Sequence, residues 1–353
     1  MLSVVIRTDA SLYIGSGHVM RCLVLAEALK NADYDVTFVC RELPGNLINF
    51  IAKKSIKVVV LSKPYRQLEV RHSADYTAWL QVSWQEDINE FLSLIKSADL
   101  VVTDHYAIDK KWEKRVKYSL NCKVLAIDDL DRDHESDLII DQNLWPDMVS
   151  RYRNCSGIKL LGPSYALLRP SFSLLRKKQI EKKNQLLAFF GGSDLTRECI
   201  KLVKAAISIG PLPFELKVVA GLGNHDYQEL LTLAEGSDIV VEQFIDNFDL
   251  ELKQSNYVIG ASGVSNWERF CLEVPSTIVS VADNQKIISE YLYNLGVVRY
   301  LGSSCSTCVD SYLSELLYLR SCWPHFGRCK LLNVDGLGVI RTIEIIKKEL
   351  LND

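Results

Sequence analysis

Short apolar runs rich in β-branched residues alternate with helix-like segments along most of this chain. The first such unit has an apolar strand at residues 4–6, a polar turn with two glycines, and a helix whose apolar positions recur at helical spacing from Val19 to Leu29. Strands that are apolar on both faces and are separated by helices predict a parallel sheet covered on both sides. The chain is therefore predicted to be an α/β protein.

This alternation occurs in two successive halves of the 353 residues. Further strands are predicted at 36–40, 58–61, 100–104, 124–127 and 138–140, and again at 186–190, 216–221, 239–241, 257–260 and 275–281. A basic stretch of low apolar content, 176–185, separates the halves and is typical of a linker or a solvated helix. We predict two Rossmann-like domains that face each other across a cleft.

The predicted boundaries follow from this pattern. The N-terminal domain is expected at 1–170, the linker at 171–185 and the C-terminal domain at 186–353. An amphipathic helix within 334–346 is expected to close the second domain.

Composition excludes several classes of protein. The chain is 48% hydrophobic and 24% charged, with a formal net charge of -3, which is ordinary globular composition. It has no basic excess of the kind that binds nucleic acid and no apolar run long enough to span a membrane. The first residues lack a signal-peptide pattern. We expect a cytoplasmic protein that acts as a monomer.

One cysteine-rich segment could hold a metal ion. The chain has ten cysteines, and five candidate zinc ligands gather near the C-terminus: Cys305, Cys308, Cys322, His325 and Cys329. A helix predicted at 310–320 separates the first pair from the others, and no second close pair follows. We therefore predict no metal site and no cofactor, and we assign no role to the segment 305–329.

His18 is the strongest candidate for chemistry in the first half. It lies at the start of the first helix, where a parallel sheet ends and α/β proteins bind anionic ligands. Imidazole titrates near neutral pH, so His18 is a candidate general base or acid. The alternative is a histidine that only packs or caps the turn.

Polar residues also follow several later strands of the first half. His105 and Tyr106 come directly after the strand at 100–104, Asp128 and Asp129 follow the next strand, and Asn143 lies beyond the strand at 138–140. Because parallel strands end at one edge of a sheet, these side chains are expected on the same edge as His18. Acids that only cap the next helix are the alternative for such loops.

The second half contains small-residue turns suited to a nucleotide. The turn 191–194 has two glycines and a serine before a helix, which lets the backbone approach a phosphate. Glu268 lies early in a later helix, where a carboxylate can accept both hydroxyls of a ribose or act as an ordinary first-turn acid. Neither half has the full dinucleotide fingerprint or a P-loop lysine. The pattern favours a nucleotide-sugar.

At these residues the chain resembles the UDP-2,4-diacetamido-2,4,6-trideoxy-β-L-altropyranose hydrolases of pseudaminic acid biosynthesis, a nonulosonic acid pathway. The motifs that carry the resemblance are at residues 14–22, 104–106, 127–129, 141–143, 162–169, 191–194, 267–269 and 282–285. They occur in the expected order over residues 1–300. The family is similar to the GT-B glycosyltransferases, notably the one that adds N-acetylglucosamine in peptidoglycan synthesis. Residues from 301 onward depart from the pattern.

The resemblance implies a mechanism and a set of site residues. His18 would activate water for attack at the anomeric carbon, which releases UDP with inversion and without a metal. Tyr106, Asp9 and Asn143 would line the sugar site. The other implied contacts are Gly192 and Ser193 to phosphate, Phe244 and Ile245 to uracil, Glu268 to ribose, and Asn284 and Gln285 to the sugar or diphosphate, with Gly17, Arg169 and Ser262 completing the substrate-binding set.

Two other functions remain open at this point. A GT-B glycosyltransferase would use the same fold and the same UDP-sugar donor but would transfer the sugar to an acceptor. A non-catalytic nucleotide-sugar binding protein would not need His18 for turnover.

Overall fold

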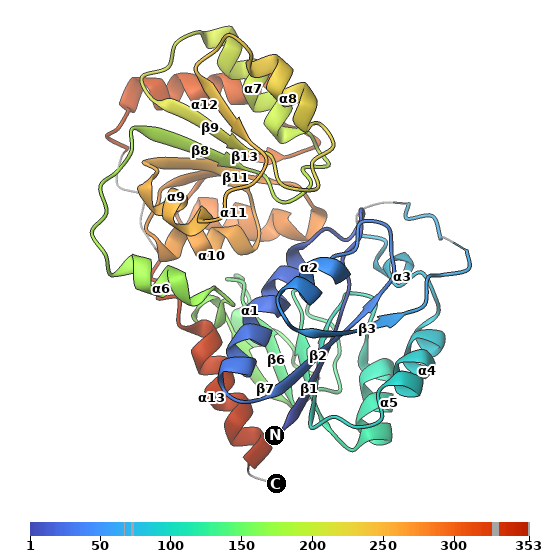
Figure 1. The fold of residues 1–353 in the computed structure, drawn as a ribbon. Coiled ribbons are helices and arrows are strands. Elements are labelled where there is room, and N and C mark those ends of the chain that lie inside the picture. The colour runs from blue at the N-terminus through green and yellow to red at the C-terminus, as the bar shows by residue number, and fades with distance from the viewer. Residues whose placement is uncertain (67, 72–73, 327–331, 352–353) are drawn as a thin grey trace. The chain divides into compact units, whose positions relative to one another are not determined.

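The computed structural model describes residues 1–66, 68–71, 74–326 and 332–351, and it divides into two compact units (Figure 1). The first unit comprises Met1–Arg169 together with Leu337–Asp353, and the second comprises Pro170–Gly336. Each unit contains its own parallel sheet. The predicted α/β class with two Rossmann-like sheets is confirmed.

The first unit is built on a sheet of seven parallel strands in the order β3-β2-β1-β4-β5-β6-β7. Its strands are β1 (Ser3–Thr8), β2 (Asp35–Arg41), β3 (Lys57–Leu61), β4 (Leu100–Asp104), β5 (Lys123–Ile127), β6 (Leu138–Asp141) and β7 (Ile158–Leu161). The order reverses between β1 and β4. The loops that follow these two strands therefore diverge to opposite faces of the sheet, and open α/β sheets bind ligands in the crevice left between such loops.

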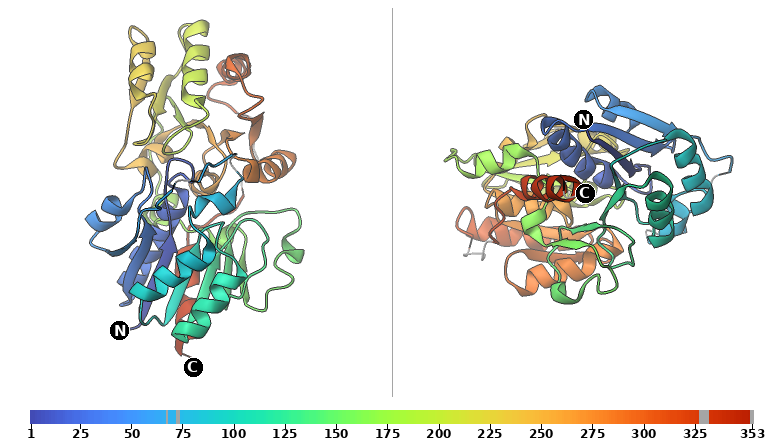
Figure 2. Two further views of the ribbon diagram at one scale, coloured as in Figure 1. Left: turned by 90° about the vertical axis from the view of Figure 1, so that its right-hand side faces the viewer. Right: turned by 90° about the horizontal axis from the view of Figure 1, so that it is seen from below.

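Helices cover both faces of this sheet. They are α1 (Gly17–Asn31), α2 (Ile48–Lys53), α3 (Tyr76–Trp79), α4 (Trp84–Leu94), α5 (Lys110–Leu120) and α13 (Gly338–Leu351), with the 3₁₀ turns η1 (Met148–Ser150) and η2 (Pro163–Tyr165). Val4 and Ile6 of β1 pack with α1 and α13, whereas Val5 packs with α4 and α5. Figure 2 shows α13 beside α1 and the pair α4 and α5 on the other face. Burial on both faces explains the continuously apolar strands.

The second unit repeats this plan with a six-stranded parallel sheet in the order β10-β9-β8-β11-β12-β13. Its strands are β8 (Gln185–Phe189), β9 (Glu215–Val219), β10 (Ile239–Glu242), β11 (Tyr257–Ala261), β12 (Ser276–Ser280) and β13 (Arg299–Ser303). Its helices are α6 (Pro170–Arg176), α7 (Glu198–Ile209), α8 (Tyr227–Ala234), α9 (Phe248–Gln254), α10 (Val264–Cys271), α11 (Lys286–Asn294) and α12 (Val309–Cys322), with the 3₁₀ turn η3 (Asp283–Gln285). The strand order reverses between β8 and β11.

The observed boundaries differ from the predicted ones at two places. The last helix, α13, belongs to the first unit and not to the second, because its apolar face packs on α1 and its first residue lies against Ala166. A Cβ atom at Gly338 would lie 2.4 Å from the backbone oxygen of Ala166, so only glycine fits there. The first part of the predicted linker, 171–176, is helical and belongs to α6, which packs against α9 and α10 of the second unit.

Two short strands were not predicted, whereas the helix predicted at 310–320 is confirmed as α12. Both strands, β7 and β13, lie at an edge of their sheet. Ile158 and Lys159 of β7 are exposed, and every residue of β13 is only half-buried. Edge strands therefore lack the apolar run that marks a central strand in the sequence.

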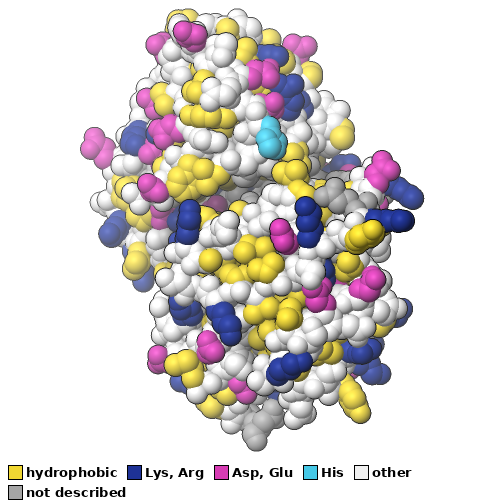
Figure 3. Space-filling model, turned by 45° about the vertical axis from the view of Figure 1, so that its right-hand side comes forward, with side chains coloured by type: hydrophobic (Ala, Val, Ile, Leu, Met, Phe, Trp, Pro, Cys, Tyr) yellow, Lys and Arg dark blue, Asp and Glu magenta, His cyan; other side chains and the backbone are white. Residues whose placement is uncertain are grey.

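The surface carries both signs of charge. Figure 3 shows basic and acidic side chains interspersed with small apolar patches on the face that it presents. Among the helices that the structure describes, none has the length and apolarity needed to cross a bilayer. Within the same residues, no group of three or more His, Cys, Asp or Glu side chains is placed to hold a metal ion. Cys329 of the cysteine-rich segment lies outside the described residues.

The packing of α13 predicts that it stabilises the first unit. Ile346 is fully buried in the cluster shared with α1, whereas Ile340 on the same helix is 47% exposed. Ile346→Ala should lower the free energy of unfolding by about 2–5 kcal/mol, because it leaves a cavity. The matched variant Ile340→Ala should change it by less than about 0.5 kcal/mol. Urea unfolding followed by circular dichroism measures both, and equal effects would contradict this packing.

Candidate functional site

His18 is positioned by the loop that joins β1 to α1. It is the second residue of α1, and its ring is buried to about nine-tenths because the helix lies against the sheet at the point where the strand order reverses. Gly17, the first residue of the helix, is exposed, and a Cβ atom there would meet nothing within 4 Å. The side-chain position of Gly17 therefore faces open space.

The imidazole of His18 is oriented by a carboxylate. Nδ1 of His18 lies 2.6 Å from Oδ1 of Asp104, the last residue of β4. Burial alone would raise the pKa of Asp104, but the positive charge of Arg21 and the contact with His18 outweigh it, so the pKa lies well below its ordinary value. An ionised carboxylate only accepts, so Nδ1 is the nitrogen that donates to Asp104, and in the neutral imidazole the lone pair is then on Nε2.

Arg21 connects this histidine pair to a second carboxylate. Its Nε and Nη2 donate to the two oxygens of Asp104 at 2.6 and 2.7 Å, and its Nη1 donates to Asp129 at 2.8 Å. Tyr106 and Asn143 also donate to Asp129, at 2.5 and 3.1 Å. Burial and the charge of Asp129 raise the pKa of Tyr106 far above its usual value, so its hydroxyl stays protonated. One buried network therefore joins the ends of β4, β5 and β6 to α1.

Aromatic rings surround His18 within the first unit. The ring of Tyr106 meets the imidazole edge to face with centroids 4.6 Å apart, and Trp79 lies 6.0 Å away in a similar orientation. Trp79 stacks on Tyr106 at 5.5 Å, and Tyr76 lies against both. The candidate base is thus enclosed by apolar ring faces, which strengthen electrostatic interactions by excluding water.

A further carboxyl group near this network holds a proton close to neutral pH. Burial, with the nearby charge of Asp129, raises the pKa of Asp141 to about 7. The Oδ2 atom of Asp141 accepts from Trp145, Arg151 and Tyr152 at 2.8, 3.0 and 3.0 Å. Its Oδ1 accepts the backbone N–H of Asn143 at 3.1 Å. Asp141 therefore holds in place the loop that carries Asn143.

Asp9 does not line an open site, contrary to the prediction. It has no exposed surface, and its Oδ1 accepts the backbone N–H of Arg41 at 2.7 Å. Arg7 lies 2.7 Å from the same carboxylate, and His105 lies 3.4 Å from its other oxygen. Asp9 therefore fixes the end of the neighbouring strand β2, and His105 packs against the same buried carboxylate.

In the second unit, the predicted phosphate-binding turn follows β8. Gly192 accepts the backbone N–H of Gly223 at 2.8 Å, and a Cβ atom at Gly221 would lie 2.4 Å from the Gly192 oxygen. Asp194 accepts the backbone N–H groups of Glu198 and Cys199 at the start of α7. Burial raises the pKa of Asp194 to about 6. Two loops thus pack backbone to backbone and leave Gly192 and Ser193 partly exposed.

The other predicted nucleotide contacts follow three more strands of the same sheet. Phe244 and Ile245 lie after β10, Ser262 and Glu268 after β11, and Asn284 and Gln285 after β12. Ser262 is buried and accepts from Asn266, and Gln285 accepts the backbone N–H of Val281. Phe244 is exposed, whereas Ile245, Glu268 and Asn284 are partly buried. Because all these strands are parallel, the residues share the carboxyl edge of the second sheet.

Arg169 is the last residue of the first unit and is partly buried. Its role as a substrate contact stays a prediction.

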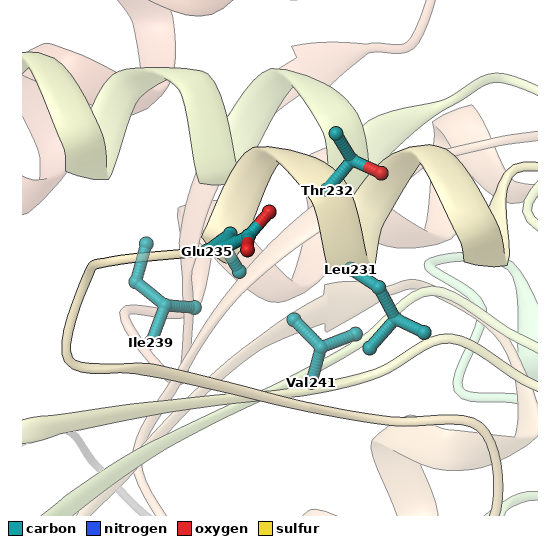
Figure 4. Close-up of a pocket in the computed structure, with 6 residues that line it drawn as sticks. Leu231, Thr232, Glu235, Ile239 and Val241 are labelled. Atoms are coloured by element: carbon teal, nitrogen blue, oxygen red, sulfur yellow. The ribbon is translucent and has the colours of Figure 1, made fainter.

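A depression elsewhere in the second unit is not placed for this chemistry. It has a volume of about 360 Å³ and lies between α8 and β10 (Figure 4). Its lining residues are Leu231, Thr232, Ala234, Glu235, Ile239 and Val241. Glu235 and Ile239 flank the connection that enters β10, at the amino edge of the sheet. Ligands of open α/β sheets bind at the opposite, carboxyl edge.

Some groups of the site were not assigned a role from the sequence. Asp104, Arg21 and Asp129 hold His18 and Tyr106 in place, and Trp79 encloses them. The sequence did contain a signal for Asp104 and Arg21. His18 and Arg21 are three residues apart on one helix face, and Asp104 is an acid at the end of a neighbouring strand. Trp79 lies on a short helix far from any motif, so the sequence contained no comparable signal for it.

Comparison with known proteins identifies the fold of this chain. No family model matches the chain. MurG from Acinetobacter baumannii has a similar structure, with a TM-score of 0.61 and 13% identity, and the match covers 99% of this chain and all of MurG. The architecture is therefore the GT-B fold, as predicted.

Two proteins with similar sequences indicate more specifically which family the chain resembles. The chain is 27% identical over 303 residues to the UDP-2,4-diacetamido-2,4,6-trideoxy-β-L-altropyranose hydrolase of Campylobacter jejuni, covering 84% of this chain and 97% of that enzyme. It is 24% identical over 346 residues to the spore coat polysaccharide biosynthesis protein SpsG of Bacillus subtilis, covering 94% of each. The resemblance to the hydrolase family that the motifs indicated is confirmed.

The ionised state of Asp104 predicts a pH dependence of stability. Its pKa is lower in the folded chain than the value of about 3.9 in an unfolded chain. The unfolded state therefore binds the proton first as the pH falls, and the stabilisation present above about pH 5 is lost progressively below it. Asp104→Asn should lower the free energy of unfolding at pH 7 by about 3–5 kcal/mol. It should also flatten the dependence on pH below about 5.

Denaturant titrations at several pH values measure both effects. The control is Glu27→Gln on α1, where the side chain is 43% exposed and only 3.6 Å from Lys54. It should leave the slope unchanged, since exposed pairs contribute little. An Asp104→Asn variant with the parental slope would show that Asp104 is not ionised in the fold.

Proposed function

We propose that the protein hydrolyses UDP-2,4-diacetamido-2,4,6-trideoxy-β-L-altropyranose to UDP and the free sugar. The observation that carries this proposal is the imidazole of His18, which is held by Asp104 so that Nε2 is left to accept a proton. The similarity to the Campylobacter jejuni hydrolase, which spans nearly all of that enzyme, supports the substrate. In a cell that makes pseudaminic acid, this reaction would be one step of its biosynthesis.

The proposed reaction needs one base and one good leaving group. Nε2 of His18 accepts a proton from water while the water oxygen bonds to the anomeric carbon from the side opposite the diphosphate. The bond from that carbon to the diphosphate oxygen breaks, UDP departs with the electron pair, and the sugar configuration inverts. The carboxylate of Asp104 stabilises the imidazolium, and the hydrogen bonds from Arg21 keep that carboxylate in its orientation.

The second unit would hold the UDP moiety. The backbone at Gly192 and Ser193 is partly exposed beside the carboxyl edge, where N–H groups can receive the charge that develops on the diphosphate. Glu268 is proposed to accept the ribose hydroxyls, and Phe244 and Ile245 to flank the uracil. Because UDP leaves readily, such donors with a base suffice, and we propose a reaction that needs no metal ion.

A GT-B glycosyltransferase is the second candidate. The specific observation in its favour is the whole-chain structural match to MurG. In that case the base would deprotonate an acceptor hydroxyl instead of water. The products distinguish the two, since a transferase releases UDP only when an acceptor is present.

The proposal predicts that His18 is required for turnover. His18→Gln should reduce kcat for UDP release by about 10²–10⁴-fold, because the amide cannot accept the proton. UDP is measured by a coupled assay with EDTA present, and the free sugar by NMR. His225→Gln, at an exposed histidine of the second unit, is the matched control and should retain parental activity. Parental UDP release by His18→Gln, or turnover only with an added acceptor, would refute the hydrolase mechanism.

A separate prediction concerns the nucleotide. Glu268→Gln should weaken UDP binding by about 10–100-fold, the effect of losing hydrogen bonds to a charged group. Isothermal titration calorimetry with UDP alone measures it without any reaction. Glu290→Gln on α11, at an exposed position, should bind UDP as the parent does. Equal affinities for the parent and both variants would place the ribose elsewhere.

A further inference from the structure

Trp79 has a buried hydrogen-bond donor that the fold does not use. The residue is 6% exposed, and its indole Nε1 finds no acceptor anywhere in the described part of the chain. Two other buried tryptophans of the first unit behave differently: Trp112 donates to Asp87 at 3.0 Å, and Trp145 donates to Asp141 at 2.8 Å. A buried N–H without a partner costs about 1–3 kcal/mol. An unpaired buried donor calls for an explanation, and one explanation is a bound molecule that accepts its hydrogen bond.

The position of Trp79 places this donor beside the candidate base. Its ring centroid is 6.0 Å from that of His18, and it stacks on Tyr106 with the planes only 27° apart. Gln81 holds the short helix α3 in place, since its amide donates to the backbone oxygens of Ala78 and Leu68 and accepts the N–H of Leu68. The indole is therefore held rigidly within reach of whatever His18 acts on.

The neighbouring groups define the chemistry of the missing partner. Asp104, Arg21 and Asp129 are paired with one another, so their charges are already compensated. Beside the imidazole of His18, the indole of Trp79 offers a neutral N–H donor bordered by aromatic faces. A group that offers a carbonyl oxygen and a methyl group fits both features, because the oxygen accepts from the indole and the methyl packs on the rings. An acetamido substituent is such a group.

We propose that the indole N–H of Trp79 donates to the carbonyl oxygen of an acetamido substituent on the substrate sugar and thereby selects acetylated sugars. This inference rests on the proposed function, since the acetamido groups are those of the sugar hydrolysed by the Campylobacter jejuni relative. A site built to hydrogen-bond a substrate group discriminates against analogues that lack it, because its donor is then left unpaired. Trp79 is thus a specificity residue and not a base.

The first test compares substrates that differ by one acetyl group. Trp79→Phe keeps an aromatic ring but removes the donor, so kcat/KM for the diacetamido UDP-sugar should fall by about tenfold. The parent should prefer this substrate over at least one of the two mono-acetylated analogues, and Trp79→Phe should reduce that preference by a similar factor. Trp84→Phe, five residues along and partly buried against the core cluster formed by α4 and α5, is the matched control and should keep the preference. An unchanged preference in Trp79→Phe overturns the proposal.

The second test does not depend on hydrolysis. In full-length protein labelled with ¹⁵N-tryptophan, the indole signal of Trp79 is assigned by its loss in Trp79→Phe. The free 2,4-diacetamido sugar should shift this signal downfield, as a new hydrogen bond requires, whereas the 2,4-diamino sugar should not. The proposal is overturned if the acetylated sugar causes no shift. It is also overturned if both sugars cause the same shift, which is the result expected when water is the partner of the indole. A selective shift without UDP release would instead retain Trp79 as the acetamido donor and refute the hydrolase.

Discussion

The guanidinium of Arg21, held between Asp104 and Asp129, is the interaction on which the first unit's site depends. It makes three charge-assisted hydrogen bonds in a region with almost no solvent exposure. Removing one partner of such a group would leave a buried charge uncompensated, which is strongly destabilising. The carboxylates in turn hold His18 and Tyr106 by direct hydrogen bonds. The geometry of the candidate base is therefore a consequence of how one buried cation is neutralised.

That network exists because of the topology of the sheet. The order of the strands reverses between β1 and β4, so the loop that precedes α1 and the loop after β4 diverge and leave room at the carboxyl edge. His18 lies at the start of α1, directly after the first loop, and Asp104 lies at the end of β4. The second unit repeats the reversal between β8 and β11, where the Gly192 and Ser262 turns begin. The same physical rule thus creates a ligand edge in each unit.

Similar strand-end positions nevertheless acquire different roles. Asp9 and Asp104 both stand where a strand of the first sheet gives way to a loop, but Asp9 fixes the backbone of Arg41 whereas Asp104 orients an imidazole. Asp141 differs again, because burial beside Asp129 raises its pKa to about 7. Which role an acid takes depends on the cation, donor or carboxylate that packs against it. Position along a strand does not supply that information.

The sequence by itself determined the α/β class, the two Rossmann-like halves and the strand-end placement of His18, Tyr106 and Asn143, because apolar periodicity and chain order are local properties. It did not reveal the edge strands β7 and β13, whose residues are too exposed to form an apolar run. Three features became known only from the tertiary structure: α13 belongs to the first unit, Asp9 is fully buried, and Trp79 lies beside His18. These outcomes depend on contacts between residues far apart in the chain, and burial and pairing are decided by such contacts alone.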